Sequence, residues 1–139
     1  MFAGLLIAAL STACVTPGGG GTELFNGKNL DGWEVTDFAG GGAIKVKDGE
    51  IHMAMGELIS GINLAHENIP RTNYELEAEA MKLDGNDFFC GLTFPVGDTF
   101  ASFIPGGWGG TVVGLSSIDG MDAAENETAT FKNFENNRW

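Results

Sequence analysis

The chain is poor in positive charge. Among its 139 residues there are 7 Lys and Arg against 19 Asp and Glu, which gives a formal net charge of −12. A field of this sign repels phosphate backbones, and the sequence contains no basic patch that would neutralise one, so nucleic acid is excluded as an expected partner. A net negative charge of this size also keeps an exported protein soluble, which is the simpler interpretation of the acidic excess.

Apolar runs are also short. The run from Phe2 to Leu10 has the length of the apolar part of a signal peptide and is too short to span a bilayer. Small residues then precede Cys14, a pattern similar to a bacterial lipobox. We therefore expect residues 1–13 to be a signal peptide of the lipoprotein type and Cys14 to be lipidated. The protein would then be exported to the cell envelope, in the periplasm or at the cell surface, and anchored to the membrane. An ordinary cleaved signal is the alternative.

Residues 14–22 begin at this cysteine and continue as "VTPGGGGT", which has the composition of a flexible tether. Only one other cysteine is present, Cys90, within "FFCGLTF". A lipidated Cys14 cannot form a disulfide, so Cys90 is predicted to be a free thiol. Its apolar neighbours favour a small buried side chain over a catalytic nucleophile.

Helical periodicity is lacking as well, and the apolar residues recur with a period of two. The Asp48-Gly49 pair between residues 43–47 and 50–53 is a strong hairpin signal, because its turn needs positive φ at both central residues. Residues 74–83, "YELEAEAMKL", alternate apolar side chains with glutamates and predict one long strand. Further strands are expected at residues 57–65, 88–96, 99–104, 111–118 and 128–134. This pattern predicts an all-β, antiparallel β-sandwich or jelly roll.

The domain itself is expected to span residues 23–139 and to start with "ELFNGKNLDGWE". In this stretch the Asn-Gly and Asp-Gly pairs predict turns, and four apolar residues are expected to be buried: Leu24, Phe25, Leu30 and Trp33. The chain finishes with "NNRW", which resembles a turn and the start of another strand, so we expect the domain to be truncated at its C-terminal side.

Three sequence elements in order carry a family resemblance. They are "FNGKNLDGW", "IKVKDGEIHM" and "TNYELEAEAMKL", within residues 23–94. They resemble the opening phrases of the DUF1080 family, also called the 3-keto-disaccharide hydrolase domain, whose members begin with a phrase such as "FNGKDLSGW". The resemblance implies a concanavalin-like jelly roll and activity on 3-keto-disaccharides or related glycosides. Here "GNDFFCGLTFPVGD" stands where members that look catalytic carry an "NSG"-type segment, and both histidines, His52 and His66, come earlier.

Hydrolysis of a 3-keto-glycoside would need a base to remove the acidified C2 hydrogen, followed by expulsion of the C1 group and addition of water. Acids in expected loops supply the candidate catalytic residues, Asp98, Asp119 and Asp122. Asp119, Asp122 and Glu125 are also candidate ligands of a divalent cation such as Ca²⁺. Their spacing matches no EF-hand, so a solvated acidic loop is the alternative.

Trp108, flanked by glycines in "PGGWGG", is the candidate substrate-binding residue. A large aromatic ring in a loop can stack on the C–H face of a sugar, whereas the alternative is that it folds back over the core. Three functions therefore remain open: a glycoside-active enzyme, a non-catalytic carbohydrate-binding module on the same fold, and a structural surface protein.

Overall fold

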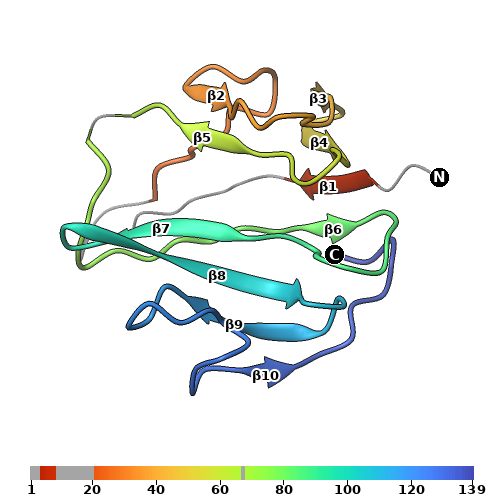
Figure 1. Ribbon diagram of the computed structural model, residues 1–139. Helices are drawn as coiled ribbons and strands as arrows, with labels where there is room; N and C mark the ends of the chain where they lie inside the picture. The colour runs from red at the N-terminus through yellow and green to blue at the C-terminus, as the bar shows by residue number, and fades with distance from the viewer. Residues whose placement is uncertain (1–3, 9–20, 67) are drawn as a thin grey trace.

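The computed structural model describes residues 4–8, 21–66 and 68–139. These residues form β-strands and turns, and none of them belongs to a helix that would be long and apolar enough to cross a membrane. The predicted all-β, antiparallel architecture is confirmed, and it is consistent with a β-sandwich of the jelly-roll type (Figure 1). Cys14 and most of the expected signal peptide and tether lie outside the described residues, and so does Glu67.

The described strands form three antiparallel sheets. The first has the order β3 (Ile44–Lys47), β4 (Glu50–Ala54), β1 (Gly4–Ala8) and β6 (Met81–Lys82). The second has the order β10 (Thr130–Phe131), β9 (Val112–Ser116), β8 (Thr99–Gly107) and β7 (Leu92–Val96). The third pairs β2 (Trp33–Val35) with β5 (Ile62–Leu64). Figure 1 shows the second sheet on one side of the molecule, with β2, β3, β4 and β5 on the other.

The hairpin predicted at Asp48-Gly49 joins β3 and β4. Both turn residues have positive φ, 53° at Asp48 and 83° at Gly49. Lys47 pairs with Glu50 at the start of the register, so the loop has two residues. The turn chemistry of the sequence therefore fixed this register, as expected for an Asp-Gly hairpin.

The main core lies between this hairpin and the β2–β5 pair. It is built on Phe25, Ile51 and Met53, which are 5%, 0% and 6% exposed. Side chains from β2, β3, β5 and the opening segment pack against them: Leu30, Trp33, Ile44, Val46 and Ile62. Each fully buried apolar side chain of this kind stabilises the fold by about 1.5–3 kcal/mol relative to an exposed one.

The opening segment is the structural element that the sequence predicted. Phe25 is buried, Leu30 and Trp33 pack on the core, and Leu24 is half-buried. The Trp33 indole Nε1–H donates to the Leu24 carbonyl oxygen at 2.7 Å, which ties the two ends of the segment together. Its turn is held by the Asn26 side-chain oxygen, which accepts backbone N–H groups of the loop at 2.8 and 3.0 Å.

The long strand predicted at residues 74–83 is wrong in extent, because only Met81 and Lys82 join a ladder. Residues 74–80 show part of the predicted alternation in burial, yet no strand neighbour pairs with them in the described chain. The Tyr74 hydroxyl donates instead to the Pro95 carbonyl. Alternation predicts an extended segment with one face turned inward, but it does not supply the backbone partner that a ladder requires.

Four of the other expected strands are shorter in the structure, and one is longer. The expected strands at 57–65, 88–96, 111–118 and 128–134 shorten to β5, β7, β9 and β10. The strand expected at 99–104 lengthens to Gly107, so that β8 absorbs the first part of "PGGWGG". A register shift between Pro105 and Gly107 lets the chain continue through this stretch, with Gly106 at a φ of 77°.

Candidate functional site

Trp108 lies in the turn that joins β8 to β9. Its φ is 43°, a left-handed backbone that a bulky side chain rarely adopts, and the two glycines that follow it have φ of 84° each. The side chain is 40% exposed. Strained positions of this kind persist only where the surroundings hold them, and they are concentrated at functional sites.

The loop that precedes β7 holds Trp108 in this backbone conformation. The Trp108 ring lies against the Phe88 ring with centroids 5.0 Å apart and planes inclined at 55°. The Asp87 carboxylate Oδ1 accepts the Gly109 backbone N–H at 2.8 Å. Gly110 permits the close approach, because a Cβ there would lie 3.0 Å from the Asn86 carbonyl oxygen. Two segments about twenty residues apart are thereby fixed to each other.

Phe88 is 52% exposed, so the pair presents two half-exposed rings to solvent. We call Trp108 and Phe88 the aromatic platform. Exposed aromatic faces favour sugar C–H groups, and a neighbouring carboxylate oxygen can accept a sugar hydroxyl. Asp87 is exposed and uses Oδ1 to hold the turn, and its Oδ2 takes part in no hydrogen bond within the described residues.

Sequence reasoning selected Trp108 and missed both supporting residues. Phe88 belongs to "FFCGLTF", which was expected to be a buried strand, whereas β7 starts only at Leu92. Asp87 belongs to the turn "DGND", in which any acid would be expected to be solvated. An acidic residue next to an aromatic one beside a turn, Asp87 and Phe88, can indicate a binding site. No local sequence pattern, however, predicts that this turn lies against the Trp108 turn twenty residues later.

The acidic loop between β9 and β10 is organised by an amide and not by its acids. Asn126 is 8% exposed, and its Nδ2 donates to the carbonyl oxygens of Leu115 at 2.7 Å and Asp122 at 3.0 Å. Its Oδ1 accepts the Thr128 hydroxyl at 2.6 Å and the Thr128 N–H at 3.0 Å. Ala123, which is fully buried, anchors the middle of the loop.

The acids of this loop are at the surface. Asp119, Asp122 and Glu125 are all exposed. Over the residues that the structure describes, no three His, Cys, Asp or Glu side chains come close enough together to hold a metal ion. The arrangement thus lends no support to a Ca²⁺ site at Asp119, Asp122 and Glu125, and it is that of a solvated loop pinned at Asn126.

Asp98, the third candidate acid, occupies the β7–β8 turn and is exposed. Arg71 holds this turn, since its guanidinium donates to the carbonyl oxygens of Gly97 and Thr99. In the described part of the chain the Asp98 carboxylate takes part in no hydrogen bond or ion pair. The structure therefore gives the three candidate catalytic acids no shared constellation, and their roles stay predictions.

The remaining reactive side chains have structural surroundings. Cys90 is a free thiol as predicted, although it is half-buried and not fully buried; desolvation raises its pKa to about 12, so the thiol is protonated at neutral pH and does not have the character of a catalytic nucleophile. His52 Nε2 lies 3.3 Å from Glu50 Oε2 in neighbouring positions of β4, although this contact lacks the geometry of a hydrogen bond. His66 packs beside Gly32, where a Cβ would lie 3.2 Å from Nε2.

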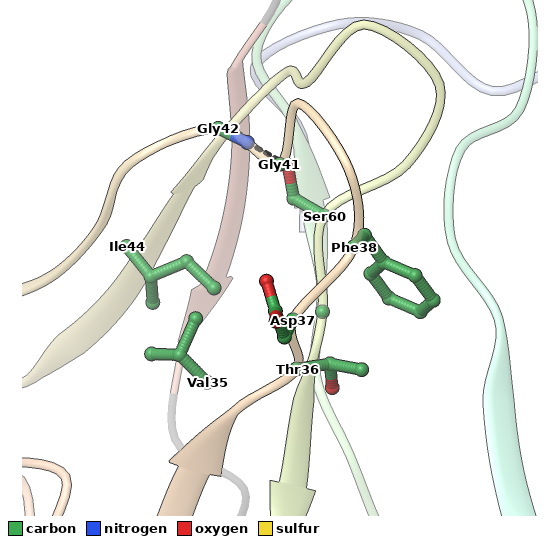
Figure 2. A pocket seen from close by; sticks show the side chains of 9 residues that line it. Val35, Thr36, Asp37, Phe38, Gly41, Gly42, Ile44 and Ser60 are labelled. Carbon is green, nitrogen blue, oxygen red and sulfur yellow. Dashed lines mark hydrogen bonds between the residues drawn. The ribbon is translucent and has the colours of Figure 1, made fainter.

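A pocket of about 240 Å³ opens beside the β2–β3 loop (Figure 2). It is lined by Val35, Thr36, Asp37, Phe38, Gly41, Gly42, Ile44, Ser60 and Gly61. The Ser60 hydroxyl is already engaged, because it accepts the Gly42 N–H at 2.8 Å and donates to a β4 carbonyl at 2.7 Å. Ligand pockets usually span about 300–1,000 Å³. The small volume and the engaged hydroxyl favour the aromatic platform as the candidate site.

Comparison with known protein families identifies one that matches most of the chain. The family model described as "3-keto-alpha-glucoside-1,2-lyase-like domain" matches residues 20–139. Searches of curated proteins and of solved structures gave no match. The match extends from the end of the Gly-rich segment through the acidic loop, so it includes the aromatic platform and every candidate acid.

Proposed function

Because the chain belongs to the family of 3-keto-alpha-glucoside-1,2-lyase-like domains, we propose that it binds glycosides on the aromatic platform of Trp108 and Phe88. The observation that carries this proposal is the left-handed backbone of Trp108, which holds a large ring 40% exposed at a turn. A backbone of this kind costs on the order of 1–3 kcal/mol, so a ring that merely filled a surface position would be expected to relax. Here the Asp87 carboxylate and the Phe88 ring maintain it.

A sugar on this platform would place its C–H face on the indole and a hydroxyl toward the Asp87 carboxylate. The test is calorimetric titration of the full chain with a glucose-containing disaccharide and with its 3-keto form. Trp108→Ala should weaken binding about tenfold, equivalent to about 1.4 kcal/mol. Trp139→Ala removes an indole that is 55% exposed elsewhere, and it is the matched control that should bind as the wild type does. Equal affinity of the Trp108 variant and the wild type would refute the platform.

The second candidate function is catalytic, and the family description favours it. A ketone at C3 acidifies the C2–H bond of the sugar. A base would take the C2 proton, the electron pair would form the C1–C2 double bond, and the C1 substituent would leave with a proton as an alcohol. Addition of water to the resulting enone would complete a net hydrolysis. The developing enolate would need nearby donors.

The candidate bases for this reaction are Asp98, Asp119 and Asp122, to which the structure adds Asp87 as the carboxylate beside the platform. We propose Asp87 as the first of these to test. The full chain would be incubated with a 3-keto-disaccharide and with the unoxidised sugar, with and without EDTA. Turnover of the keto sugar that Asp87→Asn abolishes would establish the enzyme. Sugar binding without turnover of either substrate would establish the non-catalytic carbohydrate-binding module instead.

We also propose that the domain works at the cell envelope, attached through lipid on Cys14. Support comes from the sequence alone, namely the apolar run, the small residues before Cys14 and the Gly-rich tether. In cells fed a labelled fatty acid, the wild-type chain should take up label and sediment with membranes. Cys14→Ser should lose both properties, and equal labelling of the two chains would exclude this anchor.

A further inference from the structure

β1 occupies an interior position of the first sheet. All five of its residues pair with β4, from Gly4 opposite Ala54 to Ala8 opposite Glu50. On its other side, Leu5 and Leu6 pair with Lys82 and Met81 of β6. Figure 1 shows this short strand next to β4.

The strand that β1 covers is the central strand of the core. β4 carries Ile51 and Met53, which are 0% and 6% exposed, and its opposite side is already paired with β3. Without β1, the alternate residues of β4 whose backbone N–H and C=O groups face it would be left unpaired directly beside the core, while the others stay paired with β3. β6 would lose its ladder partner in the described chain. An open apolar edge of this kind recruits another strand, since backbone pairing supplies affinity and alternate side chains supply selectivity.

The covering strand has an unusual origin. Gly4–Ala8 has the apolar sequence GLLIA, and it lies within the run expected to be a removable signal peptide. The Gly-rich stretch of residues 14–22 separates it from the rest of the domain. Both neighbours of the strand, β4 and β6, come more than forty residues later in the sequence, so neither is its partner in a short hairpin.

We propose that the gap between β4 and β6 is a strand-binding slot, and that Gly4–Ala8 is a removable strand that closes it. The slot takes one apolar five-residue strand, antiparallel to β4, in the register that Gly4–Ala8 occupies. In the chain that retains its N-terminus, the occupant is this segment itself. The edges of β4 and β6 are then paired with it and cannot bind another strand. Removal of the segment opens the slot. Only the statement about removal rests on the proposed export.

The first test places the strand by cross-linking in the full chain. In a Cys14→Ser background, Ala8→Cys with Glu50→Cys should form a disulfide on mild oxidation, since directly opposed residues have Cα atoms about 4.5–5.5 Å apart. Ala8→Cys with Lys45→Cys is the control, because Lys45 is on β3, two strands away and out of reach of a disulfide. Equal cross-linking of the two pairs, or none in either, would overturn the proposal.

The second test asks whether the slot accepts a strand in trans. Leu6→Pro removes a backbone N–H from an interior strand and should release it, whereas Leu6→Ala keeps the N–H and should not. A fluorescent peptide containing GLLIA should bind the Leu6→Pro chain about tenfold or more tightly than the wild type or Leu6→Ala, and a peptide with proline in place of the second leucine should bind none of them. Equal binding of the GLLIA peptide to all three chains would refute an occupied slot.

The two tests do not depend on each other or on the proposed binding of glycosides. If the Leu6→Pro chain fails to fold, the cross-linking result decides the matter on a chain with its native backbone. Neither test measures glycoside binding, turnover or export, so the proposed function can fail while the slot is confirmed, and the reverse.

Discussion

Replacement of Asn126 by alanine should be the most destabilising single change in the acidic loop. The side chain is 8% exposed and makes four hydrogen bonds of 3.0 Å or shorter, two donated and two accepted. A net contribution of about 1 kcal/mol for each bond places the total near 4 kcal/mol. Some of the freed carbonyls will regain water, so we expect a loss of about 3–4 kcal/mol in the free energy of unfolding.

The assay is urea denaturation of the full chain followed by circular dichroism, with the midpoint and the slope compared between variants. Asn133→Ala is the control, because Asn133 is exposed and its side chain makes no hydrogen bond within the described residues; it should change stability by less than about 0.5 kcal/mol. A loss below about 1 kcal/mol for Asn126→Ala with an unchanged slope would refute the view that this amide, and not a bound ion, organises the loop.

Three further predictions concern the thiol, a glycine contact and the platform. Burial raises the pKa of the Cys90 thiol from 9.0 to about 12, so the contribution of the protonated thiol to the free energy of unfolding is present below pH 9 and is lost as the pH rises toward 12. Over this pH range the urea midpoint should therefore fall less in Cys90→Ala than in the wild type. Gly42→Ala places a Cβ 2.2 Å from a β4 carbonyl oxygen and should cost about 1–3 kcal/mol, whereas Gly41→Ala, whose nearest contact is 3.3 Å, should cost less in the same denaturation assay. Asp87→Ala frees the Gly109 N–H and should weaken sugar binding several-fold in calorimetry without a comparable loss of stability; unchanged affinity would separate the turn from the site.

Much of the fold could be predicted because its signals are local. An Asp-Gly pair between two alternating runs specifies its own turn, and β3 and β4 formed in the expected register. The opening segment was also predictable, since Phe25 and Trp33 are separated by turn residues that leave few ways to bury both. The extent of β6 was not predictable, because a ladder depends on a neighbour whose position the alternation of residues 74–80 does not encode.

The candidate site was predictable only in part, for a related reason. A tryptophan between glycines indicated an exposed ring, and Trp108 is 40% exposed. Phe88 and Asp87 come from a different loop, and their role exists only because β7 and β8 pair and carry the two loops to one end of the sheet. The acids at 119–125 looked like a ligand set because they are close in sequence, whereas the buried amide of Asn126 turns the loop so that they lie apart in solvent.

The sequence by itself determined the all-β class, the central hairpin, the core of the opening segment and the family, because periodicity, turn chemistry and short motifs act over a few neighbouring residues. The tertiary structure decided the partners: the strand beside β4, the phenylalanine beside Trp108 and the carbonyls around Asn126. These contacts join residues that are from four to more than forty positions apart. Most of these contacts form only when the strands pair and the sheets pack together, so no pattern of neighbouring residues predicts them.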